Sequence, residues 1–106
     1  MKKILVVDDA ELNSELLYDI LKDDYMIEMA ANGEEALEHL RKSHHEISAL
    51  VLDLRMPKID GFAVIKEMQQ KGLIQQIPTL IISSEHAIEI ENLCFQLGIS
   101  DFIHKP

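Results

Sequence analysis

Five polar residues in this sequence are of types that could together bind a metal ion and a phosphate. They are Asp8, Asp9, Asp53, Ser83 and Lys105, and each follows a short, largely apolar run. Carboxylates brought close together repel one another unless a cation joins them, and Mg²⁺ prefers carboxylate oxygens, water and substrate phosphates. A hydroxyl and an ammonium group donate to phosphoryl oxygens. The set therefore favours a site where Mg²⁺ and a phosphoryl group meet.

Asp53 is the natural nucleophile of such a site, because a carboxylate can attack phosphorus and form an aspartyl phosphate. Phosphoryl transfer mainly requires in-line positioning and neutralised charge, which this set of side chains supplies. Each residue alone also has an ordinary explanation. Asp53 could cap a turn, Ser83 could form one, and Lys105 could be a surface lysine. All five lie near the ends of predicted strands, which favours a site over coincidence.

The apolar runs themselves predict strands that are buried on both faces, as in a parallel sheet covered by helices. The run Tyr25–Ala30 contains the charged residue Glu28 in its interior and is predicted to lie nearer an edge of the sheet. The five predicted strands are Ile4–Val7, Tyr25–Ala30, Ala49–Asp53, Thr79–Ile82 and Asp101–His104.

Between these strands, apolar residues recur with the helical period. Cys94 lies on one of these apolar stripes and is interpreted as a core side chain. The helices are predicted within residues 12–21, 34–40, 62–68 and 85–97. Alternating strands and helices predict an α/β fold of three layers, with a doubly wound, five-stranded parallel sheet. With the flavodoxin-like strand order 2-1-3-4-5, the polar strand ends converge on one edge.

Composition limits the possible functions of the chain. Its 106 residues fit one domain, and 10 basic against 19 acidic residues give a net charge of −9. Such a surface disfavours binding to nucleic acid or to anionic membranes. The single cysteine excludes an internal disulfide. No apolar run is long enough for a signal peptide or a membrane helix, so we expect a soluble, cytoplasmic protein.

Over nearly its whole length the sequence resembles the receiver domain of two-component response regulators. The resemblance rests on six features of that family. They are the acidic pair Asp8-Asp9, the phosphoacceptor Asp53, the M-P-x-x-D-G turn at Met56–Gly61, the switch hydroxyl Ser83, the switch aromatic Phe102 and the ending Lys105-Pro106. Together these motifs are highly specific.

The resemblance implies a signalling switch that catalyses only its own phosphorylation and dephosphorylation. Asp9, Asp53 and the backbone carbonyl of Arg55 would bind Mg²⁺, and Asp8 would act largely through water. A histidine kinase or a phosphotransfer protein would supply the phosphoryl group. The Lys105–Pro106 peptide would be cis, which proline makes accessible.

The same resemblance implies how phosphorylation would change the surface of the protein. Phosphorylated Asp53 would attract the Ser83 hydroxyl, and Phe102 would turn inward to fill the space vacated. The surface around helix 85–97 would then change shape. The plain alternative is that Phe102 is an ordinary aromatic residue at the end of a strand.

The sequence departs from the family at its end, because receivers continue through a fifth helix and this sequence stops at Pro106. We therefore expect one receiver domain over residues 1–106 that ends before its last helix. One sheet face, near Leu5 and Ile103, would lack cover. We expect a homodimer, aggregation or low stability, unless a further segment or a neighbouring chain covers that face.

Three other functions are compatible with parts of this pattern. A haloacid-dehalogenase-type phosphohydrolase needs a second acid two residues after its nucleophile, where this sequence has Arg55. A flavodoxin-like flavin binder must hold a phosphate in its first loop, where Asp8, Asp9 and Glu11 would repel one. A phosphorylation-independent, receiver-like interaction module lacks positive support but stays open.

Overall fold

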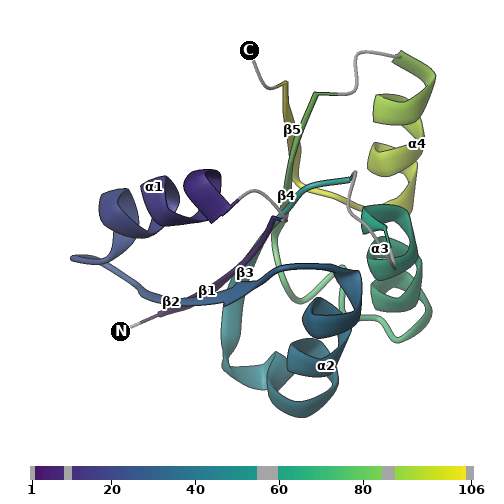
Figure 1. Cartoon of the computed structure of the whole chain (residues 1–106). Coiled ribbons are helices and arrows are strands. Elements are labelled where there is room, and N and C mark those ends of the chain that lie inside the picture. Colours follow the sequence, from purple (N-terminus) through teal and green to yellow (C-terminus); the bar gives the residue numbers. More distant parts are fainter. Residues whose placement is uncertain (1, 9–10, 55–59, 85–87, 105–106) are drawn as a thin grey trace.

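The computed structural model describes residues 2–8, 11–54, 60–84 and 88–104, with the backbone alone for residues 11–14. Strands and helices alternate along the chain (Figure 1). The elements are β1 (Lys3–Val7), α1 (Glu11–Leu21), β2 (Met26–Ala30), α2 (Gly33–Ser43), a 3₁₀ helix (His44–Glu46), β3 (Ile47–Leu52), α3 (Gly61–Gln70), β4 (Thr79–Ser83), α4 (Ile88–Leu97) and β5 (Asp101–His104).

The five strands form one parallel sheet in the order β2-β1-β3-β4-β5, which confirms the predicted topology. Strand β2, which carries Glu28, lies at one edge, as predicted. Along the sheet, Val7 of β1 is level with Ala30 of β2 and with Leu52 of β3. The carboxyl ends of three neighbouring strands therefore lie at the same height.

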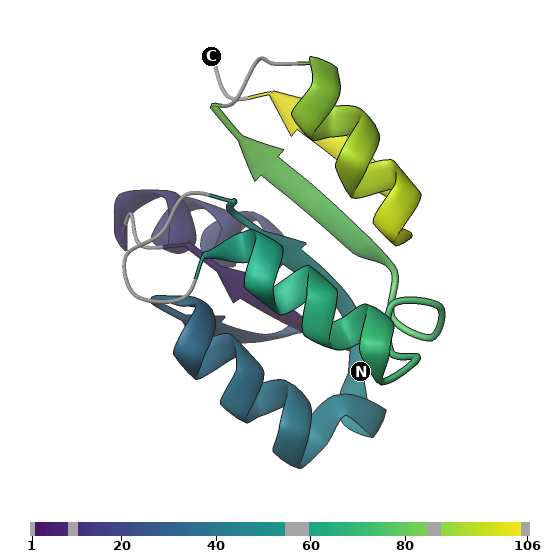
Figure 2. The same ribbon diagram turned by 90° about the vertical axis from the view of Figure 1, so that its right-hand side faces the viewer.

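Helices cover the two faces of the sheet unequally. Helix α1 lies on one face, while α2, α3 and α4 lie side by side on the other (Figures 1 and 2). The core forms beneath α2, α3 and α4, where Leu40, Ile65, Met68 and Cys94 are fully or almost fully buried against the sheet. The three-residue spacing of Ile65 and Met68 places both on the same side of α3. The burial of Cys94 confirms its prediction as a core residue.

Helices α2 and α3 begin with side-chain caps. The Asn32 side chain accepts a hydrogen bond from the Glu35 backbone N–H at 2.9 Å, and Glu35 Oε2 accepts one from Ala31 N–H at 2.8 Å. This reciprocal pair is a variant of the capping box. Asp60 accepts from Ala63 N–H at 3.1 Å and so fixes where α3 starts.

A bidentate ion pair joins α2 to α3. Arg41 donates to both oxygens of Glu67, at 3.0 and 2.8 Å, and Lys71 Nζ lies 3.1 Å from Glu67 Oε2. The hydrogen bonds from Arg41 are the main reason why the pKa of Glu67 lies below its usual value. Such a pair holds the two helices in register at their carboxyl ends.

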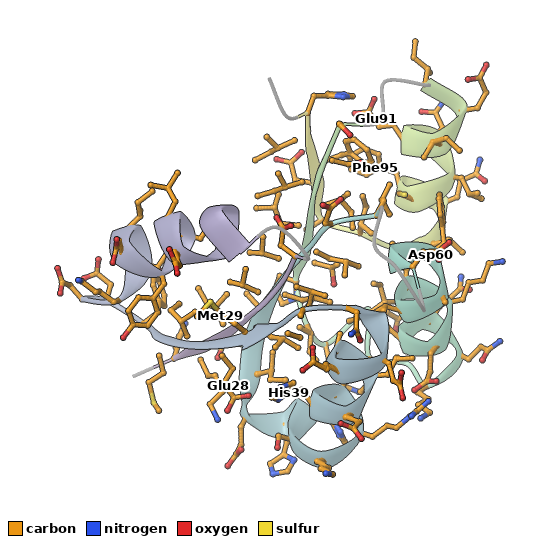
Figure 3. All side chains as sticks on the ribbon, in the orientation of Figure 1. Glu28, Met29, His39, Asp60, Glu91 and Phe95 are labelled. Carbon is orange, nitrogen blue, oxygen red and sulfur yellow. The ribbon has the colours of Figure 1, made fainter. Side chains whose placement is uncertain are left out.

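A second charged cluster joins α2 to the edge of the sheet. Glu28 lies 2.9 Å from Lys3 Nζ and 2.9 Å from His39 Nδ1 (Figure 3). The hydrogen bond from Lys3 is the main cause that lowers the pKa of Glu28. Strands β1 and β2 and helix α2 are thus connected at a point remote from the polar strand ends.

Small differences from the predicted elements occur at their ends. Strand β3 begins at Ile47, two residues earlier than predicted, and a 3₁₀ helix precedes it. Residues 85–87, predicted to begin the last helix, lie outside the described residues, and α4 is described from Ile88. Among the described residues, no helix has the length and apolar character needed to cross a bilayer.

Candidate functional site

Asp8 and Asp53 lie next to each other because the hydrogen bonding of the sheet continues one residue beyond β1 and β3. The Asp53 N–H donates to the Val7 carbonyl at 2.9 Å, and the Asp8 N–H donates to the Ala30 carbonyl at 3.1 Å. Only 8% of Asp8 and 6% of Asp53 is exposed. Two nearly buried carboxyl groups therefore stand at the carboxyl ends of adjacent central strands.

The apolar strands explain this placement. Strand β1 is almost wholly buried, and Leu50 and Leu52 of β3 are fully buried, so the first polar residue of each run comes where the strand reaches the rim. The register that pairs Val7 with Leu52 then brings Asp8 level with Asp53. Parallel α/β sheets bind their ligands at this edge.

Ser83 and Phe102 lie on the next two strands toward the other side of the sheet. Ser83 is the last residue of β4 and is fully buried. Because Leu52 pairs with Ile81, the ends of β3 and β4 place Asp53 and Ser83 at the same edge. Phe102 of β5 pairs with Ile81 of β4 and is also buried, so its aromatic ring belongs to the core in this structure.

A groove of about 490 Å³ opens beside the two carboxyl groups on the α1 side of the sheet. Its lining is mainly apolar, with Asp8, Asp53 and His104 as the polar members. The residues that line it are Val6, Val7, Asp8, Leu16, Leu17, Val51, Asp53, Ile82, Ile103 and His104. The polar side chains of the site thus lie beside a wide apolar surface.

Leu5 and Ile103 were both predicted to lie on the uncovered face of the sheet, and only one of them does. Ile103 is 46% exposed and lines the groove, as predicted. Leu5, in contrast, is fully buried in the core formed beneath α2 and α3. Neighbouring residues of a strand point to opposite faces, and the groove therefore lies on the face that carries Val6, Val51 and Ile82.

The donor set in the described residues fits a hard divalent cation. Two carboxyl groups that are almost buried require compensation for their charge, and Mg²⁺ takes oxygen ligands of this type. Within the described part of the chain, no group of three His, Cys, Asp or Glu side chains is arranged to hold a metal. Asp9, Arg55 and Lys105, which were predicted to complete the site, lie outside the described residues.

Gly61 contributes to the site in a way that the sequence did not indicate. A Cβ atom at this position would lie 2.6 Å from the Asp53 carbonyl oxygen and 2.7 Å from Leu54 Cα. The Gly61 N–H also donates to the Leu54 carbonyl at 3.0 Å. The motif containing Asp60-Gly61 predicted a turn, but this approach to the backbone of Asp53 depends on how α3 packs.

Comparison with known proteins points to one family. A family model described as "Response regulator receiver domain" matches residues 4–106. The transcriptional regulatory protein PhoP of Bacillus subtilis, named for alkaline phosphatase synthesis, is 36% identical over 106 residues, which are 99% of this chain and 42% of that protein. A two-component response regulator of Oryza sativa is 30% identical, over 97% of this chain and 77% of its own length.

Solved structures agree with this match. The non-phosphorylated HemR receiver domain of Leptospira biflexa superposes with a TM-score of 0.89 at 31% identity, covering 100% of this chain and 83% of that one. The chain spans at most 30% of several longer relatives, among them hybrid signal transduction histidine kinases of Dictyostelium discoideum. The likeness therefore concerns one domain and not the whole of those proteins.

Proposed function

Because this chain belongs to the response regulator receiver domain family, we propose that it is a phosphorylation-dependent switch of a two-component system. Asp53 accepts a phosphoryl group from a histidine kinase or a phosphotransfer protein. The observation that carries this proposal is the position of the Asp53 carboxyl group, which lines the groove together with Asp8 at the carboxyl edge of the sheet.

Mg²⁺ is the cofactor that these residues would hold. Asp8 and Asp53 are its candidates in the described residues, and family resemblance adds Asp9 and the Arg55 carbonyl. When bound, the ion neutralises negative charge on the phosphoryl oxygens. The other steps of the transfer are carried out by side chains of this chain.

In the proposed transfer, a carboxylate oxygen of Asp53 attacks the phosphorus of a phosphohistidine. An O–P bond forms, the N–P bond breaks, and the imidazole leaves with the electron pair of that bond. The Ser83 hydroxyl and the Lys105 ammonium group donate to the phosphoryl oxygens.

The output begins at Ser83 and Phe102 in this proposal. The hydroxyl of Ser83 moves toward the new phosphoryl oxygens, and the ring of Phe102 follows into the space that it leaves. Both residues are buried, so such a movement requires their neighbours on β4, β5 and α4 to adjust. The surface of α4 and β5 then differs between the two states.

The decisive experiment is incubation of the chain with acetyl phosphate and Mg²⁺, followed by intact-mass measurement. We expect the wild type to gain one phosphoryl group and Asp53→Ala to gain none. Asp19→Ala is the matched control, because Asp19 is an exposed acid on α1 and should not affect the reaction. Omitting Mg²⁺ should abolish the gain in mass.

The same experiment tests the rival function. A wild-type chain that acquires no phosphoryl group would favour a phosphorylation-independent interaction module. So would a phosphorylated chain whose backbone amide NMR spectrum is identical to that of the unmodified chain. No described residue supports the rival specifically.

A further inference from the structure

His104 occupies a position between the proposed phosphorylation site and the α4 surface. It is the last residue of β5 and is level with Ser83 of β4. Its ring lies with its centroid 5.1 Å from that of the Phe102 ring, at an interplanar angle of 51°. His104 also lines the groove that contains Asp8 and Asp53. One side chain therefore borders the groove and both proposed switch residues.

The imidazole of His104 also reaches α4. Its Nε2 atom lies 3.6 Å from Oε2 of Glu91, which is ion-pair distance when the ring is protonated. The two side chains are 39% and 28% exposed, so this pair is only partly screened by solvent. Figure 3 shows Glu91 on α4 near the strands at the C-terminal edge of the sheet. The contact joins α4 to β5 outside the apolar core.

The charged residues near this contact are mostly acidic. Residues 88–103 contain no lysine or arginine, and their acids are Glu89, Glu91 and Asp101. His104 also lines the groove that contains the acidic residues Asp8 and Asp53. Glu85, His86 and Lys105 are close in sequence to these elements but lie outside the described residues. Among the described residues of α4 and β5, His104 is thus the side chain able to carry positive charge.

We propose that His104 is a positioning residue of the switch, which holds α4 against β5 through Glu91 while its ring supports Phe102. This inference rests on the proposed phosphorylation switch. The held arrangement is that of the unmodified protein, in which Phe102 is buried and α4 lies over the end of β5. Any movement of α4 that follows phosphorylation must break or lengthen the contact between Glu91 and His104.

The test uses beryllium fluoride with Mg²⁺ as a phosphoryl mimic, with the response followed in the NMR signals of Phe102 and α4. Removal of the contact in Glu91→Gln should lower the concentration that gives half the response by about two- to fivefold, the range expected for a partly exposed pair. His104→Gln should act in the same direction. Glu89→Gln, a neutralised exposed acid on the same helix, should leave the response unchanged.

Two further variants separate positioning from a general effect on structure. The double variant Glu91→Gln/His104→Gln should shift the response no more than one of the single variants, because both remove one contact. The charge-reversed pair Glu91→Lys/His104→Glu should return the response toward the wild-type value. Thermal denaturation of each variant shows whether overall stability has changed.

The possible outcomes distinguish this inference from the proposed function. If the wild type responds and Glu91→Gln behaves like Glu89→Gln, the positioning role is wrong and the switch stands. Additive effects in the double variant would also overturn it, since they mean that the residues act separately. If the wild type neither responds to beryllium fluoride nor accepts a phosphoryl group on Asp53, both proposals fail together.

Discussion

At the scale of single residues, the burial of Asp8 and Asp53 determines the chemistry that they support. A charged carboxyl group with less than a tenth of its surface exposed must be compensated by hydrogen bonds or opposite charge. Water reaches both groups from the groove, and so does any ligand. In the proposed switch, a divalent cation bound at this position would therefore favour the arrival of a phosphoryl group.

Cys94 provides a prediction at the residue scale. Burial, assisted by the negative charge of Glu91, raises the pKa of its thiol from 9.0 to about 11. Only the thiolate is nucleophilic, so at pH 8 the native protein should react with iodoacetamide about a hundredfold more slowly than the urea-unfolded chain. Alkylation followed by mass spectrometry measures both rates. Equal rates would mean that Cys94 is accessible in the native state.

Leu5, His104 and Glu91 show why the sequence could not predict the whole site. A strand that is apolar throughout does not reveal which residues face which layer, and Leu5 was therefore assigned to the wrong face. His104 and Glu91 belong to different elements, and their contact depends on how α4 crosses β5. Asp8, Asp53 and Ser83 were predictable as neighbours because strand order and the ends of apolar runs suffice to bring them together.

At the scale of elements, α3 and the segment that follows β3 fit together only because Gly61 has no side chain. The Cβ atom of an alanine would meet backbone atoms of Asp53 and Leu54 at 2.6 and 2.7 Å, and backbone cannot move aside as a flexible side chain does. The start of α3 is also fixed by the Asp60 cap. If α3 or the backbone at Asp53 and Leu54 shifts to make room for a Cβ atom, the carbonyl of Asp53 must therefore move.

We predict that Gly61→Ala destabilises the fold by about 1–3 kcal/mol, as overpacking does, and slows phosphorylation of Asp53. Gly72→Ala is the matched control. Its positive φ of 73° makes alanine strained, but nothing lies near its Cβ position and the residue is remote from Asp53. It should lose stability while retaining phosphorylation. Urea denaturation and the acetyl phosphate assay measure the two effects, and equal phosphorylation rates for both variants would contradict this prediction.

The elements themselves were largely predictable, and their ends were less so. The strands and helices occur in the predicted order because each apolar run matches the period of its element. The additional residues of β3, from Ile47, and the 3₁₀ helix before it were missed. Ser48 interrupts the apolar run, and pairing of Lys3 with Ile47 extends β3 across that interruption. Tertiary pairing of this kind is not visible in local sequence.

At the scale of the whole molecule, a strongly acidic chain carries an uncovered apolar face. The Cα radius of gyration is 12.6 Å, close to the value of about 13 Å expected for a compact domain of this length. The fold is therefore compact although α1 alone covers one face of its sheet among the described residues. Leu16 and Ile20, one helical turn apart on α1, are 59% and 62% exposed, and Ile103 is exposed beside the groove.

We predict that the 106-residue chain self-associates through this face, because contact between two copies removes the exposed apolar side chains from water. The net charge of −9 opposes association, so the associated fraction should rise with salt as the repulsion is screened. Light scattering coupled to size-exclusion chromatography measures the mass at low and high salt. Leu16→Glu, which places a charge in the groove, should restore the monomer. Ile88→Glu adds the same charge at an exposed position on α4, on the opposite side of the sheet, and should not. A stable, monodisperse wild-type monomer at every salt concentration would show that this prediction is wrong.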